Sequence, residues 1–551
     1  MKIKLAQLDI VRILLSISLF LIIFGFGWTK GGRWDLNEQI LTGYTIVRDH
    51  QSAYLAGTDG GFAPVTVYSY LQPLLLGLFT LVISPKSLEV VTVCLLAPSL
   101  GVIFYNLLLS LSLRLRPERY PRQLHSLYAI VLFTIFAISR DYLSYLSELK
   151  PDTLALVFLG LALYSTVNIS PLNARHHLKS LSRFDAALPV SGFIYLAVSA
   201  KQQTFLPVLV CGLFLMLSAY SVWRGLLYIS SSLLGIILPS LLMPGYSILT
   251  IYSHAGRGYE SIPGVIRSST HSVALVAVAI CTVIVFAGPI IDITQSNRIS
   301  FFGRKMLVPF RRLHPSELSI AVPGNIVIDQ IFDFRSGESG SKSVYGLFLI
   351  ATISWFFAQF ASTFNLGGNQ GNFQIGILPL VAITLPWVFQ VNILSNSSAP
   401  SKYLSFAIIF ASVILPLSIL IYGYSIYKVP SFIARDNAFQ KSIKSRSSSS
   451  LPILVDGDSS LIAFESGLTN QISLYHAIHL SFGKKANLSG QPFLRHLRDI
   501  SADRRIFYFL KHPINHFQGD IRLRYLRQIK IVSQSCLQGQ NFCYGYLDIE
   551  S

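Results

Sequence analysis

The sequence predicts a polytopic α-helical membrane protein with about eleven transmembrane helices, followed by a small extracytoplasmic α/β domain at the C-terminus. The first observation is the composition, because 52% of the 551 residues are hydrophobic and only 13% are charged. A soluble domain usually carries about a quarter charged residues. The second observation is that the apolar residues form long runs separated by short basic loops. The third is a serine-rich stretch near residue 445, after which short strand-like runs replace the long ones.

The first apolar run, residues 10–28, is long enough to cross a bilayer as a helix. It does not read as a cleaved signal, because many similar runs follow it and no small-residue cleavage site ends it. Lys2 and Lys4 precede the run, so the N-terminus is expected in the cytoplasm.

The arginine-rich loops predict the rest of the topology. Four arginines between residues 114 and 122 place that loop in the cytoplasm. With the N-terminus also inside, the number of crossings before this loop must be even. Residues 64–84 are therefore expected to lie along the membrane as a juxtamembrane segment rather than to cross it. The predicted spans are 10–28, 87–113, 127–139, 153–167, 188–200, 205–222, 226–242, 273–293, 345–364, 375–394 and 403–427.

The chain is predicted to have three parts: a transmembrane module (1–427), a linker (428–450) and a soluble extracytoplasmic α/β domain (451–551). The serine-rich composition of residues 441–450 is typical of a linker. Short apolar runs in the last part indicate buried strands. They lie at 451–455, 506–510 and 529–532.

Cys536 and Cys543 both fall in the part of the chain assigned to the outside, where disulfides persist. Their spacing closes a short loop that a hairpin accommodates if the two Cα atoms come within reach. We therefore expect a disulfide between them.

The net charge of +18 does not indicate nucleic-acid binding. The excess lysine and arginine lie largely in the loops between spans, where membrane topology accounts for them. The expected surroundings are the lipid bilayer, with no nucleic-acid partner.

Two carboxylates follow the first predicted span. Asp35 and Glu38 lie three residues apart, so they would share one face of a helix at the edge of the membrane. The simpler interpretation is a solvated loop, in which acidic residues need no further role.

The same topology places more polar residues on the outer side. They are Glu148, Lys150 and Asp152 before the span 153–167, Lys201 after the span 188–200, Arg257 in a later loop and Asn369 in a glycine-rich turn. Each has a simpler interpretation, since Asp152 could cap a helix, Lys201 could reach the interface and Asn369 could form a turn. Ionisable groups clustered at membrane depth, however, usually mark a substrate path or an active site.

This arrangement resembles the GT-C membrane glycosyltransferases, which use polyprenyl-phosphate sugar donors. Protein O-mannosyltransferases and the aminoarabinose transferase of lipid A belong to that family. The resembling segments are 34–38, 68–74, 148–152, 200–204 and 368–373. The acidic pair most common in the family is an adjacent Asp-Glu, whereas Leu36 and Asn37 separate Asp35 from Glu38 here. The resemblance therefore assigns the base more firmly to Asp35 than to Glu38.

The resemblance implies an inverting transfer of a sugar from a polyprenyl-phosphate donor to a lipid, glycan or protein acceptor. It implies a multi-pass protein of the plasma (inner) membrane with its site on the extracytoplasmic face. It assigns Asp35 and Glu38 as the catalytic residues, and Glu148, Lys150, Asp152, Lys201, Arg257 and Asn369 to substrate binding. No cofactor is required by these residues, and dependence on a divalent metal stays open.

Two other classes of protein have similar features. A transporter or flippase would also have many spans with few charges, but transporters often contain internal repeats and broken helices at the midplane. An oligosaccharide polymerase or ligase would favour a large central outer loop rich in arginine. The polar outer residues of this chain lie instead near the N-terminus and at the C-terminus.

Overall fold

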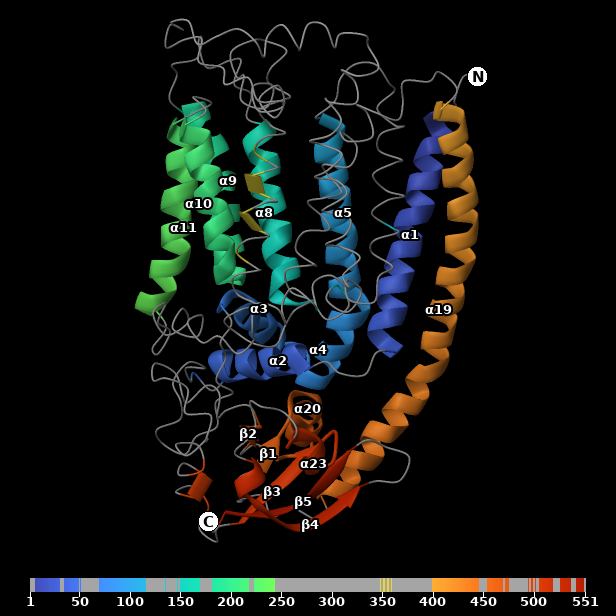
Figure 1. The fold of residues 1–551 in the computed structure, drawn as a ribbon, viewed down its shortest axis with the longest axis vertical. Coiled ribbons are helices and arrows are strands. Elements are labelled where there is room, and N and C mark those ends of the chain that lie inside the picture. Colours follow the sequence, from blue (N-terminus) through green and yellow to red (C-terminus); the bar gives the residue numbers. More distant parts are fainter. Residues whose placement is uncertain are drawn as a thin grey trace, which may run out of the picture.

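The computed structural model shows a helical bundle with a mixed α/β domain at one end (Figure 1). The longer segments that the structure describes are 5–29, 34–48, 69–114, 149–168, 181–217, 222–242, 399–444, 453–468, 471–474, 505–518, 526–536 and 542–549. Single residues and pairs between these segments are also described, at 50, 134, 146, 347, 350–351, 354–355, 358, 494, 497–498 and 501. The predicted spans 127–139, 273–293, 345–364 and 375–394 lie wholly or mostly outside the described residues.

The helices of the bundle run roughly side by side (Figure 1). Their bounds are α1 (Leu5–Thr29), α5 (Ala97–Arg114), α8 (Pro151–Asn168), α9 (Leu181–Ala200), α10 (Phe205–Leu217), α11 (Val222–Leu242) and α19 (Ala399–Lys444). Helix α4 (Pro85–Val91) continues through a π-helical turn (Thr92–Leu96) into α5. Helices α8 to α11 pack around a shared apolar core that includes Leu159, Ile194, Val208 and Tyr228.

Four helices among the described residues are long and apolar enough to cross a membrane, and three shorter apolar helices accompany them. Apolar side chains also face outward, which a bilayer accommodates and water does not. On α1 the residues Ile10 and Ile13 are more than half exposed, and on α19 the same holds for Ile409 and Val413. These surfaces and lengths are those of a protein that lies in a membrane.

Two short helices lie across the end of the bundle, and one of them falls in the segment 64–84 that was predicted to run along the membrane. They are α2 (Trp34–Val47) and α3 (Leu71–Phe79), and α2 is seen running across the direction of the long helices in Figure 1. The segment 71–79 is far too short to cross a bilayer as a helix. It therefore occupies the juxtamembrane position that the charge argument favoured.

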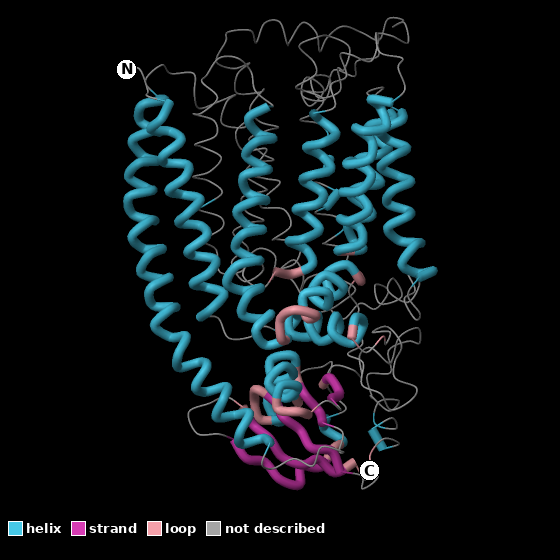
Figure 2. Tube along the Cα trace, turned by 180° about the vertical axis from the view of Figure 1, so that it is seen from behind, coloured by secondary structure: helices cyan, strands magenta, loops and turns pink. Residues whose placement is uncertain are grey.

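The C-terminal domain contains a five-stranded mixed sheet of order β2-β1-β3-β5-β4. Its strands are β1 (Ile453–Val455), β2 (Gln471–Ser473), β3 (Arg505–Leu510), β4 (Lys530–Cys536) and β5 (Cys543–Asp548). Strands β1, β2 and β3 are parallel, while β5 pairs antiparallel with both β3 and β4. Strand β3 is buried on both faces of the sheet. Its sequence therefore has five consecutive apolar or aromatic residues instead of an alternating pattern. Figure 2 shows the sheet beyond α2 at the end of the molecule.

A disulfide joins the ends of β4 and β5. The sulfur atoms of Cys536 and Cys543 lie 2.03 Å apart, and the two residues are direct partners in the antiparallel ladder. The bond closes the hairpin at the edge of the sheet.

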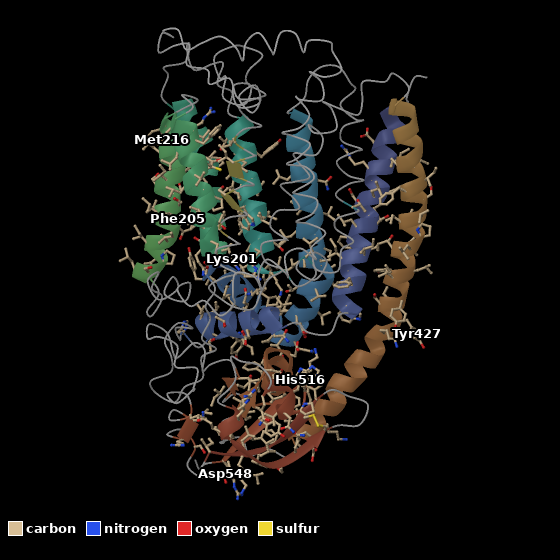
Figure 3. The ribbon with its side chains drawn as sticks, in the orientation of Figure 1. Lys201, Phe205, Met216, Tyr427, His516 and Asp548 are labelled. Carbon is tan, nitrogen blue, oxygen red and sulfur yellow. A yellow bond between two sulfur atoms is a disulfide. The ribbon has the colours of Figure 1, made fainter. Side chains whose placement is uncertain are left out.

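The structure differs from the sequence prediction in the segment expected to be a linker. Helix α19 does not end near residue 427 but continues to Lys444, so residues 428–444 are helical. The physical reason is that the helix end has a packing partner, because Ile443 is buried among Val455, Phe507 and Phe509 of the sheet domain. Helix α19 changes direction near Tyr427 in Figure 3, close to Pro430, which removes one helical hydrogen bond.

The sheet domain is docked on α2 through its helix α20 (Gly457–Glu465). Leu461 of α20 is fully buried in an apolar cluster with Leu36, Ile40 and Leu41 of α2. The Tyr44 and Phe464 rings meet edge to face, with centroids 4.9 Å apart. Burial of a leucine side chain of this kind contributes about 1.5–3 kcal/mol, so the contact fixes the domain against the bundle.

Helices α2 and α3 cross with their backbones nearly in contact, which only glycine permits. A Cβ added at Gly43 would overlap the Pro73 carbonyl oxygen and would lie 2.6 Å from the Gly77 nitrogen. A Cβ added at Gly77 would overlap the Gly43 carbonyl in return. The two glycines therefore set the distance between the two juxtamembrane helices.

We predict that Gly43→Ala lowers the unfolding temperature of the purified protein and its yield in membranes, because α2 and α3 must then separate. The matched control is Gly423→Ala on α19, where an added Cβ meets nothing within 4 Å. That change should be neutral or slightly stabilising, since alanine is favoured over glycine in helices by about 1 kcal/mol. Equal unfolding temperatures for the two variants would contradict the role of the glycine crossing.

Candidate functional site

The polar segments singled out in the sequence that the structure describes gather at one end of the bundle, beside the sheet domain. The segments are α2, the start of α3, the turn that opens α8, and the end of α9 (Figure 1). Figure 3 places Lys201 at the end of α9 that lies closest to α3. The beginning of α1 and Arg114 at the end of α5 lie at the opposite end of the bundle. The described residues predicted to share the outer side therefore lie at one end of the fold.

Asp152 and Lys201 form a buried ion pair. The Lys201 ammonium donates to Asp152 Oδ2 over 3.0 Å, and the side chains are only 2% and 5% exposed. Asp152 stands in the first turn of α8, and Lys201 follows the last residue of α9. Asp152 thus fits the expected helix-start position, but Lys201 is held inside the protein rather than at the lipid interface. The pair joins the two helices through residues that are 49 positions apart in the sequence.

The turn before α8 is held by α3. Leu149 has a positive φ of 48°, a left-handed conformation that a leucine seldom adopts. The Gln72 side-chain amide donates to the Leu149 carbonyl oxygen, in a bond buried in the protein. This contact fixes the direction in which the chain enters Lys150, Pro151 and Asp152.

The start of α3 is also bonded to the end of α9. Ser69 Oγ donates to Gln202 Oε1 over 2.8 Å. The hydroxyl of Tyr70 contacts the hydroxyl of Tyr195 and donates to Ser199 Oγ over 3.2 Å. One short stretch, residues 69–72, therefore bonds to both the opening of α8 and the end of α9. This stretch is one of the segments that resemble the GT-C family, but its residues had no individual role in the sequence-based prediction.

Asp35 and Glu38 both lie on α2, as the helical interpretation of their spacing requires. Glu38 is half-buried and interacts with other groups. Asp35 occupies the first turn of the helix, and its side chain lies outside the described part of the structure. Asn37 between them is buried, and its amide donates to the Gly457 carbonyl oxygen at the start of α20 over 2.9 Å. The sheet domain is thus attached to α2 within the acidic segment itself.

The remaining candidate residues divide into two groups. Lys150 is described, is half-buried and interacts with other groups. Glu148, Arg257 and Asn369 lie outside the described residues, so the structure does not place their side chains. Among the described residues, no group of three or more His, Cys, Asp or Glu side chains is arranged to hold a metal ion.

A second polar cluster, not predicted from the sequence, lies where β1 and β3 end. The two strands are parallel neighbours, so their carboxyl ends meet at one edge of the sheet. Asp456 follows β1 and accepts from the Lys511 amide over 2.8 Å. Lys511 in turn pairs with Asp458 over 3.0 Å. Because Gly457 is bonded to α2, this edge of the sheet faces the juxtamembrane helices.

Burial raises the pKa of Asp456 from 3.8 to about 6, and the nearby Asp458 carboxylate adds to the effect. Hydrogen bonds from the Lys511 and Ser459 amides oppose the shift. The pKa of His512 is lowered, first by burial and then by the neighbouring His516 and Lys511. The sequence carries only a weak signal for this cluster, because Asp-Gly-Asp after a strand is also typical of an ordinary helix start.

No family model matches the sequence, and no curated protein matches it. Among solved structures, the chain is similar to the Cupriavidus metallidurans ArnT bound to undecaprenyl phosphate, with a TM-score of 0.49 and 11% identity over 98% of both chains.

The chain is also similar to the oligosaccharyltransferase of Archaeoglobus fulgidus in its apo form. The TM-score is 0.46 at 12% identity, covering 98% of this chain and 74% of that one. A further structure is the archaeal oligosaccharyltransferase AglB from Archaeoglobus fulgidus in complex with an inhibitory peptide and a dolichol-phosphate. It gives a TM-score of 0.44 at 11% identity, over 97% of this chain and 74% of that one.

We predict that Lys201→Met destabilises the protein by about 3–5 kcal/mol, because it leaves the buried Asp152 carboxylate without its partner. The double variant Asp152→Asn/Lys201→Met should recover most of that loss, since neither group is then charged. Chemical unfolding of the purified protein measures both values. The control is Arg12→Met, which removes an exposed ion pair with Asp9 and should change stability by less than about 1 kcal/mol. A double variant no more stable than Lys201→Met would contradict the ion-pair account.

We predict that Asp456 makes the sheet domain less stable as the pH rises from about 4 to about 7. Its folded pKa of about 6 exceeds the unfolded value of 3.8, so the folded state binds the proton more tightly. The stabilisation is complete below the unfolded pKa and is lost as the pH rises through the folded one, by roughly 3 kcal/mol. Hydrogen exchange at the amides of β1 and β3 measures this stability.

Asp456→Asn is the comparison variant for this pH dependence. The lowered pKa of His512 acts in the opposite direction, so the difference between the unaltered protein and Asp456→Asn isolates the aspartate. A difference that stays constant from pH 4 to 7 would show that Asp456 does not titrate in this range.

Proposed function

We propose that this protein is a membrane glycosyltransferase that moves a sugar from a polyprenyl-phosphate donor to an acceptor on the extracytoplasmic face. The observation that carries the proposal is the position of α2. A helix with Asp35 and Glu38 lies across the end of an apolar bundle, between the buried Asp152–Lys201 pair and a folded polar domain. A carboxylate at the boundary between lipid and water can meet a lipid-linked donor from one side and a polar acceptor from the other.

In the proposed reaction, Asp35 acts as the general base. It removes the proton from an acceptor hydroxyl or amine, whose oxygen or nitrogen then attacks the anomeric carbon of the donor sugar. The bond from that carbon to the phosphate oxygen breaks, and polyprenyl phosphate leaves with the bonding electrons. Attack on the face opposite the phosphate inverts the configuration. The first turn of a helix favours the charged form of a carboxylate, which is the form that accepts a proton.

Cationic side chains would hold the leaving phosphate. Lys150 and Arg257 are the proposed contacts from the chain around the site. Lys201 is fixed by Asp152 at 3.0 Å, so the pair is neutral as a whole and attracts a phosphate less than a free lysine would. We therefore assign Lys201 and Asp152 chiefly to holding the start of α8 against the end of α9. Lys150, in the turn that begins α8, is then the cation positioned to contact the phosphate.

The bundle supplies the place for the lipid. The apolar outer faces of the spans are suited to a polyprenyl chain, while the sheet domain is held against the acidic segment of α2 by the Asn37–Gly457 bond. The acceptor would approach from the side of the sheet domain. The proposed orientation places the sheet domain outside and the start of α1 in the cytoplasm.

We predict that Asp35→Asn reaches the membrane and folds normally but transfers sugar about a hundred to ten thousand times more slowly. Asparagine keeps the size and hydrogen bonding of aspartate but cannot take a proton. Glu38→Gln should have a smaller effect, because Glu38 matches the family motif less well. The assay is transfer from polyprenyl-phosphate sugars in membranes, with the amount of folded protein measured in parallel.

Normal activity of Asp35→Asn would place the base elsewhere, and Glu148 would become the next residue to test. If the unaltered protein consumes no polyprenyl-phosphate sugar, the glycosyltransferase proposal fails and a transporter becomes the better interpretation.

A further inference from the structure

Helix α2 carries buried polar groups that have no hydrogen-bond partner among the residues that the structure describes. Gln39 is 1% exposed, and neither its amide oxygen nor its amide nitrogen is bonded within the part of the chain that the structure describes. Thr42 is fully buried, and its hydroxyl is likewise without a partner there. A glutamine amide can form about four hydrogen bonds, and leaving a buried one unmet is unfavourable. A ligand that supplies the missing partners would remove this cost.

Two faces of α2 are already occupied by protein. Asn37 and Tyr44 contact the sheet domain, and Gly43 meets α3. In an α-helix of 3.6 residues per turn, positions 39 and 42 lie on the side away from positions 37 and 44. Gln39 and Thr42 thus lie away from the contact with the sheet domain, and Gln39, one helical turn before Gly43, lies beside the glycine crossing.

The same side of the helix includes the position of the proposed base. Asp35 precedes Gln39 by four residues, and Thr42 follows Gln39 by three, which are the spacings of neighbours on one helix face. Positions 35, 39 and 42 therefore form one continuous row along α2.

Another unpartnered group lies close to this row. The Gln72 side-chain N–H donates to the Leu149 carbonyl oxygen, but the buried oxygen of the same amide has no partner among the described residues. Gln72 is next to Pro73, whose carbonyl oxygen lies against Gly43, one helical turn from Gln39. The groups without partners thus come from α2 and α3 at the place where the two helices cross.

We propose that Gln39 and Thr42 bind hydroxyl groups of a sugar beside Asp35, with Gln72 at the edge of the same site. This inference rests on the glycosyltransferase function proposed above and adds the residues that recognise the sugar. Amide and hydroxyl groups are uncharged and both donate and accept hydrogen bonds, which matches the hydroxyls of a sugar ring. A phosphate would call for cations, and a polyprenyl chain would leave these groups unmet. The sugar is either that of the donor or that of a glycan acceptor.

The test uses Gln39→Leu and Thr42→Val, which replace each polar group by an apolar one of similar size. If the groups serve a ligand, removing them should leave the unfolding temperature unchanged or raise it, because an unmet buried polar group disappears. Transfer should nevertheless fall by about tenfold or more, because the bound sugar loses a hydrogen-bond partner. A purely structural role would lower stability and activity together.

Thr45→Val is the matched control on the same helix. Thr45 is also buried, but its hydroxyl donates to the Leu41 carbonyl over 2.8 Å within α2. It has no unmet group to offer a ligand, so transfer by this variant should match that of the unaltered protein. Binding of bare polyprenyl phosphate, which carries no sugar, should be the same in all four proteins.

The assay measures transfer from polyprenyl-phosphate hexoses and pentoses by the full chain in detergent, with the unfolding temperature measured alongside. A raised KM for the donor would assign the site to the donor sugar, and a raised KM for the acceptor would assign it to a glycan acceptor. The inference is overturned if Gln39→Leu and Thr42→Val transfer normally, or if they lose stability in proportion to activity. Absence of transfer by the unaltered protein would instead overturn the proposed function itself.

Discussion

The close approach of α2 and α3 at Gly43 and Gly77 is the constraint on which the candidate site depends. The backbones nearly touch there, so α2 is held flat across the end of the bundle instead of continuing the direction of α1. From α3, hydrogen bonds extend to the Leu149 carbonyl and to Gln202. A single short crossing therefore positions the acidic helix, the opening of α8 and the end of α9 relative to one another.

The side of α2 that contacts the sheet domain makes that domain part of the candidate site. Asn37 donates a hydrogen bond to the first residue of α20, and Leu461 of α20 is buried against α2 and α4. The edge of the sheet where β1 and β3 end is thereby brought next to the acidic segment. Asp456 and Lys511 stabilise that edge by bonding to each other across the two strands. Movement of the sheet domain would consequently disturb the position of α2.

Buried polar groups are used in two different ways in this structure. Asp152 and Lys201 satisfy each other at 3.0 Å and join two helices, which is a structural use of charge inside an apolar bundle. Gln39 and Thr42 are as deeply buried but have no partners among the described residues. The contrast separates groups that hold the fold from groups that are available to a ligand, although the residue types alone do not reveal which is which.

The sequence by itself determined the features that depend on composition and local pattern. Long apolar runs predicted the helices now seen as α1, α8, α10 and α11, and charge bias placed the polar ends of several helices on one side. Apolar runs after residue 450 coincide with β1, β3 and β4. The spacing of Asp35 and Glu38 was consistent with the helix in which they lie.

Only the tertiary structure decided which distant residues meet, because such contacts leave no periodic trace in the sequence. The pairing of Asp152 with Lys201 and the bond from Asn37 to Gly457, 420 residues apart, depend on how whole helices pack. The continuation of α19 to Lys444 depends on the burial of Ile443 against the sheet, which outweighs a linker-like local composition. The unmet Gln39 and Thr42 could be recognised only once the neighbours of α2 were known, since a hydrogen-bond partner is a property of the surroundings and not of the residue.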